Sequence, residues 1–93
     1  MRVISSKMLV QFSARYAEAD TPLQAWRKIV EESRFSGFAQ LKSAFAAVDK
    51  VGDCHVFNIG GNKYRLITRI HFNRQMLFIR HVLTHKEYDK WKP

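Results

Sequence analysis

The sequence predicts an α+β fold in which helices come first and a small, mainly antiparallel sheet follows. Apolar residues recur at helical spacing in the first half of the chain, and from Cys54 onward they recur at every second position. Two turn signals, Gly60-Gly61-Asn62 and Asn73-Arg74, divide the alternating part into strands. With 93 residues we expect a single domain spanning 1–93, because a second would not fit.

The N-terminal part is expected to form a short strand and then a helix. Val3 and Ile4 would form the strand, and Ser5 or Ser6 would cap a helix that runs to about Ala19. The apolar residues at helical spacing in this segment are Met8, Leu9, Phe12 and Tyr16.

A second helix is expected from Asp20 to about Ser33, packed beside the first as a hairpin on the sheet. Asp20-Thr21-Pro22 combines a capping residue with a proline in the first turn, and Ser36-Gly37 follows the end. Residues 38–48 also fit a helical period, but the segment is short. The buried stripe of the second helix should be Leu23, Trp26, Ile29 and Val30.

Three strands and a short C-terminal helix are expected after Cys54. The central strand has two unlike faces: its even positions are mostly apolar and should pack on the helices, whereas its odd positions are mostly basic and should point outward. The outward set is Lys63, Arg65, Ile67, Arg69 and His71. The three expected strands are His55–Ile59, Lys63–Phe72 and Gln75–Leu83.

A hairpin closed by the second turn would bring the last strand onto the same outward face. Phe78 would lie opposite Arg69, and Arg80 opposite Ile67. From that position Arg80 would reach both Arg65 and Arg69. Arginine holds phosphate in a bidentate manner, and an exposed aromatic ring stacks on an unpaired base. This face therefore predicts a surface for polyanions, the alternative being a solvated basic sheet face. If the last strand contained a bulge, we would expect Arg80 to move off this face.

The length of the glycine turn decides which residue of the preceding strand faces the basic side. With a two-residue turn at Gly60-Gly61, Asn58 faces the basic side. With a three-residue loop, His55 does so instead, and both alternatives remain open.

The segment Thr84–Asp89 reads as a capped helix with ionisable side chains. Thr84 and Glu87 have the spacing of a capping box. His85, Tyr88 and Asp89 share one helical face, which suits proton transfer by histidine. The alternative is a terminal helix docked on the core through its aromatic side chains. No metal site is expected, because His85 and Asp89 lack an obvious third ligand.

The positive charge is concentrated in the C-terminal part of the chain. The net charge is +8. Residues 55–93 carry eight Lys or Arg and two acids, whereas residues 1–54 carry eight and six. This asymmetry favours RNA or DNA as a partner, and an acidic protein would also be attracted. A single cysteine, Cys54, indicates a reducing cytosol. The N-terminus has no long apolar run, so neither a signal peptide nor a membrane span is expected.

The segments VFNIGGNKYRLITRIHF (Val56–Phe72) and THKEYD (Thr84–Asp89) together resemble the HigB family of toxins. These are RelE-like, ribosome-dependent mRNA interferases of bacterial toxin–antitoxin systems. The resemblance is close over Val56–Asp89, and before that only the order of elements fits. It implies a RelE-like microbial ribonuclease fold, mRNA cleavage in the decoding site of the ribosome, and an antitoxin, often a helix-turn-helix protein. The matching residues are Asn58, Gly60, Gly61, Asn62, Tyr64, Arg65, Leu66, Arg80 and Thr84 to Asp89.

The resemblance also implies a reaction that uses no metal and no cofactor. The 2′-OH of the RNA attacks the adjacent phosphate and leaves a 2′,3′-cyclic phosphate, which requires a base, cations and an acid. We expect Arg65 and Arg80 to hold the phosphate. His85 is the candidate for proton transfer, with Tyr88 stacking on a base or acting as acid and Asp89 orienting His85. The candidates for binding mRNA or ribosomal RNA are Lys63, Arg69, His71, Phe78 and Lys86.

Two other functions use the same features. A non-catalytic RNA- or ribosome-binding module would use the same basic sheet. A DNA-binding regulator is disfavoured, because the sequence offers no clear helix-turn-helix and its charge lies on strands.

Overall fold

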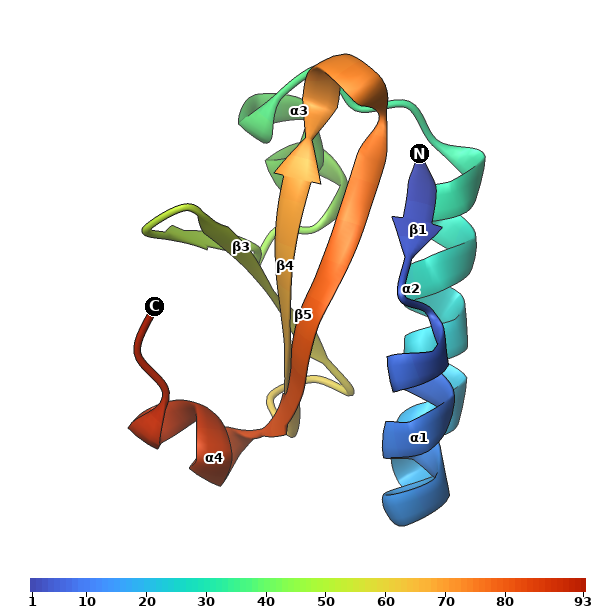
Figure 1. The fold of residues 1–93 in the computed structure, drawn as a ribbon, viewed down its shortest axis with the longest axis vertical. Coiled ribbons are helices and arrows are strands. Elements are labelled where there is room, and N and C mark those ends of the chain that lie inside the picture. The colour runs from blue at the N-terminus through green and yellow to red at the C-terminus, as the bar shows by residue number, and fades with distance from the viewer.

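The computed structural model describes residues 1–93 as a five-stranded sheet with helices on both sides (Figure 1). The strand order is β1-β5-β4-β3-β2; β1 runs parallel to β5, and every other pair is antiparallel. The predicted α+β class and the mainly antiparallel sheet are confirmed. The elements are β1 (Arg2–Ile4), α1 (Lys7–Arg15), a 3-10 turn (Ala17–Ala19), α2 (Asp20–Glu32), α3 (Phe38–Ala44), β2 (Asp49–Val51), β3 (Cys54–Ile59), β4 (Tyr64–His71), a 3-10 turn (Phe72–Arg74), β5 (Met76–Thr84) and α4 (His85–Lys90).

The main core lies between the sheet and the pair α1 and α2. Figure 1 shows these helices side by side on one side of the sheet, with α4 and the C-terminus on the other. The buried stripe of α2 is Leu23, Trp26 and Val30, as predicted, but Ile29 is 44% exposed and lies outside it. The predicted even face of β4 packs toward this core, where Leu66 has no exposed surface. We call the opposite side of the sheet the outward face.

The helix ends differ from the predicted ones. The first helix stops at Arg15 rather than near Ala19, because Tyr16 has a non-helical backbone and its ring packs against Phe12 at 4.7 Å. Neither serine caps α1 through its side chain: Ser6 stands at the cap position without such a bond. Asp20 is inside α2 rather than capping it.

Residues 38–48 form a helix and a turn, and a short strand begins directly after them at Asp49. The segment Phe38–Ala44 forms α3, in agreement with the helical period of its apolar residues. The strand β2 was not predicted, since three residues are too few to show an alternating pattern. It pairs with β3 across a turn in which Gly52 has φ 59°, a conformation that glycine adopts without strain.

The loop between β3 and β4 decides which β3 residues face outward. Asn58 pairs with Arg65 and Ile59 with Tyr64, so the loop comprises residues 60–63. A four-residue loop, like a two-residue turn, leaves the same side chains of β3 on the outward face. Asn58 therefore lies on the outward face and His55 on the core side. The β4–β5 connection contains the predicted turn residues Asn73 and Arg74, and its residue with positive φ is Gln75 (54°). The Gln75 amide fixes this turn by donating to the backbone oxygens of Phe35 and Phe72.

The inward position of His55 gives it an unusual environment for an ionisable group. Its ring lies 5.7 Å from the ring centroids of both Phe38 and Phe72, and its Nδ1 is buried without a partner. Burial, with a smaller contribution from the Lys50 charge, lowers the pKa of His55 from its ordinary value of 6.5. The unfolded chain therefore binds this proton more readily than the folded chain, and the folded state loses stability as pH falls below about 6.5.

We expect His55→Phe to weaken the acid sensitivity of the fold. The wild-type free energy of unfolding should drop between about pH 7.5 and about pH 5, and the variant should lose less over the same interval. Urea unfolding at both values measures the two differences. His71→Asn, a change at an exposed histidine, serves as the matched control and should behave as wild type. Equal losses in wild type and His55→Phe would contradict the assignment.

Candidate active site

A β-bulge in β5 shapes the outward face. Thr68 pairs with Ile79 and Ile67 pairs with His81, so Arg80 between them has no partner on β4. The predicted pairing of Ile67 with Arg80 is therefore wrong. Closer to the hairpin turn, the predicted pairing of Arg69 with Phe78 is confirmed.

The bulge keeps Arg80 on the outward face, contrary to expectation. Leu77 and Ile79 point into the core, and after the bulge Val82 packs against the same core. Two consecutive residues, Arg80 and His81, thus point outward, as a bulge allows. The sequence reasoning missed His81. The sequence did contain a signal for it. The core-facing residues of β5 occupy odd positions before Arg80-His81, at Leu77 and Ile79, and an even position after this polar pair, at Val82.

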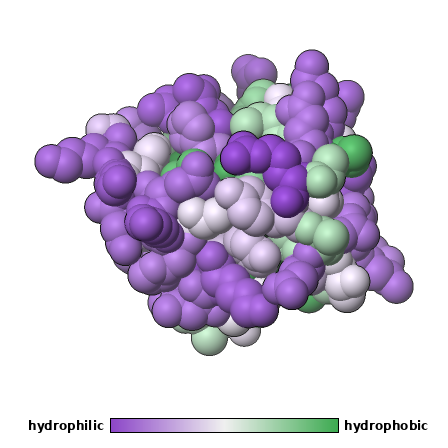
Figure 2. Space-filling model, turned by 90° about the horizontal axis from the view of Figure 1, so that it is seen from below, coloured by the Kyte–Doolittle hydropathy of each residue, from purple (hydrophilic) through white to green (hydrophobic).

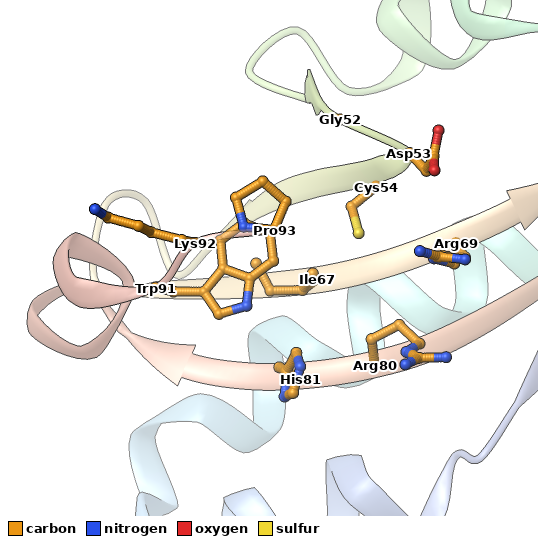
Figure 3. Close-up of a pocket in the computed structure, with 10 residues that line it drawn as sticks. All are labelled: Gly52, Asp53, Cys54, Ile67, Arg69, Arg80, His81, Trp91, Lys92 and Pro93. Atoms are coloured by element: carbon orange, nitrogen blue, oxygen red, sulfur yellow. The ribbon is translucent and has the colours of Figure 1, made fainter.

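Arg69 and Arg80, here called the arginine pair, line two neighbouring hollows on this face. One hollow has a volume of about 420 Å³. Figure 3 shows Ile67 and the Cys54 thiol at its floor, Trp91 and Pro93 at one side, the arginine pair at the other, and His81 on β5. The second hollow, about 240 Å³, is lined by the arginine pair, His71 and Phe78. The arginine pair therefore lies between His81 and His71.

Arg65 does not join the arginine pair. It is only 8% exposed, and its guanidinium donates to the Asn62 side chain and to the backbone oxygens of Asn62 and Tyr64. The Tyr88 ring lies over it, 5.5 Å from the guanidinium carbon to the ring centroid. Arg65 lines neither hollow. The expected cluster of Arg65 with Arg80 is therefore not formed. Instead, Arg65 supports α4 through its contact with the Tyr88 ring.

The capping box of α4 is confirmed by its two hydrogen bonds. The Thr84 N–H donates to Glu87 Oε1 at 2.9 Å, and the Glu87 N–H donates to Thr84 Oγ1 at 3.2 Å. His85 Nδ1 lies 3.6 Å from Asp89 Oδ2, on an exposed side of the helix. Tyr88 stacks on Trp91, with ring centroids 5.8 Å apart. His85, Tyr88 and Asp89 line neither hollow, so their catalytic roles stay predictions.

The two predicted RNA-binding lysines lie away from the arginine pair. Lys63 belongs to the β3–β4 loop rather than to β4, and its ammonium lies 3.3 Å from the Glu18 carboxylate. Its expected place on the outward strand face is therefore wrong. Lys86 is exposed on α4. No group of three His, Cys, Asp or Glu side chains is placed to hold a metal ion.

The surface at the α4 end of the molecule is mainly polar. Figure 2 views the molecule from below, the side on which α4 lies in Figure 1, and shows mostly hydrophilic residues with small, separate hydrophobic areas. A surface of this kind suits a polar partner better than an apolar one. None of the helices is long and apolar enough to cross a membrane.

Comparison with known proteins assigns the family. Residues 19–91 match the family described as HigB_toxin, RelE-like toxic component of a toxin-antitoxin system. The chain belongs to the HigB toxin family. It is 37% identical over 92 residues to the mRNA interferase toxin HigB of Escherichia coli K12, covering 96% of this chain and 88% of that protein. An mRNA interferase HigB of Escherichia coli O6:H1 is 28% identical over 93 residues, 97% of this chain and 90% of that one.

These matches confirm the resemblance seen in the sequence and extend it into the N-terminal half. The α+β architecture of this HigB chain is consistent with the RelE-like fold that the resemblance implied. As a member of this family, the chain is the toxic component of a toxin–antitoxin system, which implies an antitoxin partner.

We expect Asn62→Ala to destabilise this HigB chain, because it removes a side-chain acceptor from the buried Arg65 guanidinium. The loss in free energy of unfolding should be about 1–2 kcal/mol, reduced by the partial solvent exposure of the bond. Urea unfolding measures it, and Asn73→Ala, at an exposed asparagine without a side-chain bond, is the control. If both variants unfold alike, the Asn62–Arg65 bond contributes little to stability.

Proposed function

We propose that this chain is an endoribonuclease that cuts mRNA in the decoding site of the ribosome and so blocks translation. The observation that carries the proposal is the arginine pair, two exposed guanidinium groups between two histidines on an open sheet face. The relatives bear the name mRNA interferase, and the concentration of positive charge in residues 55–93 suits RNA.

The proposed reaction is attack of a ribose 2′-OH on the adjacent phosphate, which expels the 5′-oxygen and leaves a 2′,3′-cyclic phosphate. The arginine pair would hold the phosphate and stabilise the charge that grows on its oxygens. In-line attack needs a base and an acid on opposite sides of the phosphate. His81 and His71, on either side of the arginine pair, suit these tasks. His85, oriented by Asp89, is the alternative proton-transfer group.

The proposed setting is the bacterial cytoplasm, where the chain would meet translating ribosomes and its antitoxin. The net charge of +8 favours contact with ribosomal RNA as well as with the message. It would also attract an acidic antitoxin surface. We propose a helix-turn-helix antitoxin, the type that the family resemblance implies.

Induction of the chain in a bacterial host tests the function. The 5′ ends of one message are mapped in two copies, of which one is translated and the other lacks a ribosome-binding site. New ends within codons of the translated copy alone are expected. Growth arrest without new ends would favour a non-catalytic ribosome-binding module. Ends in both copies would indicate a free ribonuclease that does not need the ribosome.

Histidine variants assign proton transfer. We expect His81→Asn to lower the single-turnover cleavage rate on programmed ribosomes by roughly 10²–10⁴, the range for general acid–base catalysis. His85→Asn should have a much smaller effect, because His85 lines neither hollow beside Arg80. The opposite order of effects would transfer the role to His85 and Asp89.

A further inference from the structure

The 420 Å³ hollow is lined by an aromatic and apolar part, a histidine and a pair of arginines. These match the base, the ribose and the phosphate of a nucleotide. We infer that it is a subsite for one unpaired mRNA nucleotide, whose base lies against Trp91 and whose phosphate lies on the arginine pair. This inference rests on the proposed function. It adds Trp91 and the hollow beside it, neither of which the sequence marked as a binding site.

The walls of the hollow are arranged in the order that a nucleotide requires. In Figure 3, Trp91 lies at one side, Arg69 and Arg80 at the other, and His81 between them on β5. A base at Trp91 and a phosphate at the arginine pair would set the ribose above His81. That arrangement presents the ribose 2′-OH to His81, one of the two histidines proposed for proton transfer.

The base end of the hollow combines an apolar floor with the edge of an aromatic ring. Ile67 and Cys54 give it an apolar floor. Trp91 is only half-buried, and Figure 3 shows the nitrogen-bearing edge of its ring facing Ile67 and His81. Stacking of the Tyr88 ring on Trp91 holds the indole in place. A fixed aromatic edge beside an apolar floor can meet any base edge-to-face, because every base has a π face.

The phosphate end is the more polar part of the hollow. Arg69 and Arg80 line it, whereas Lys92 lies at the opposite end beside Trp91 and Pro93 (Figure 3), and the one acid in the lining is Asp53. In Figure 3 the Asp53 carboxylate points away from the floor, so it leaves the arginine pair free to meet an anion. The hollow volume falls within the range of about 300–1,000 Å³ typical of small-molecule sites.

The chain has two tryptophans, which makes the test direct. Trp26 is 3% exposed in the helix-side core, so its indole N–H reports on the fold, whereas that of Trp91 reports on the hollow. The ¹⁵N–¹H spectrum of the purified chain should contain two indole signals, and Trp91→Phe assigns them. The probes are the four nucleoside 3′-monophosphates and inorganic phosphate.

We expect each nucleotide to shift the Trp91 signal and leave the Trp26 signal in place. Nucleotides should bind roughly tenfold more tightly than inorganic phosphate, and the difference reports the contact of the base with Trp91 and the apolar floor. Trp91→Ala, followed through its backbone amide signals because it lacks this indole, should remove that difference, and Arg69→Ala should weaken the binding of both kinds of probe. Equal affinity for nucleotide and phosphate, or an unmoved Trp91 signal in the wild-type chain, would overturn the subsite even if Trp91→Ala fails to fold.

This outcome is separable from the proposed function. Codon-specific cuts in cells together with an unmoved Trp91 signal would refute the subsite alone. A shifted Trp91 signal without any cleavage on the ribosome would leave the subsite in place and refute the enzyme.

Discussion

Arg80→Ala should lower single-turnover mRNA cleavage on programmed ribosomes by about 10²–10³ while leaving ribosome affinity much less affected. Removing a preorganised cationic donor from a reacting phosphate has an effect of this size in comparable sites. The bulge holds Arg80 on the outward face with Arg69, so the exposed side chain can reach a bound phosphate without supporting the core. Growth of cells that express the variant should accordingly recover.

Two further variants separate catalysis from charge. Arg80→Lys keeps the positive charge but loses the two-pronged donor geometry, so its cleavage rate should lie between those of wild type and Arg80→Ala. Arg27→Ala removes one arginine from α2, where it pairs with Glu31 at 3.0 Å, and should cleave as wild type. A loss of cleavage in Arg80→Ala that merely follows a loss of ribosome affinity would favour the binding-module alternative.

Leu66→Ala should cost about 3 kcal/mol of the free energy of unfolding. Leu66 has no exposed surface and lies on the core side of β4, in the middle of the sheet. Truncating such a residue removes apolar contacts and leaves a cavity, with a typical cost of about 2–5 kcal/mol. A chain of this size has about 5–15 kcal/mol in total, so the loss is a large share. The melting temperature should fall by more than about 10 °C.

Urea and thermal unfolding of the purified chain measure this effect. Val10→Ala, at a residue of α1 that is 62% exposed, is the matched control and should change stability by less than about 0.5 kcal/mol. Similar losses in both variants would show that the sheet-to-helix core is not the main source of stability.

The sequence by itself determined most of the helices and strands and the two faces of β4. Alternation along β4 separated the core side from the outward face, and local chemistry specified the capping box of Thr84 and Glu87. The ordered matches in Val56–Asp89 were sufficient for the family. These features depend on near neighbours in the chain, so a single sequence records them.

The tertiary structure decided which basic residues share a site. A bulge at Arg80 breaks the simple register, puts His81 beside it, and separates both from Arg65. The segment after α4 folds back over the sheet, where Trp91 packs beside Ile67, while Tyr88 covers Arg65. Alternation assigns a residue to a face, but only pairing between distant strands and packing of the C-terminal segment fix its neighbours and its exposure.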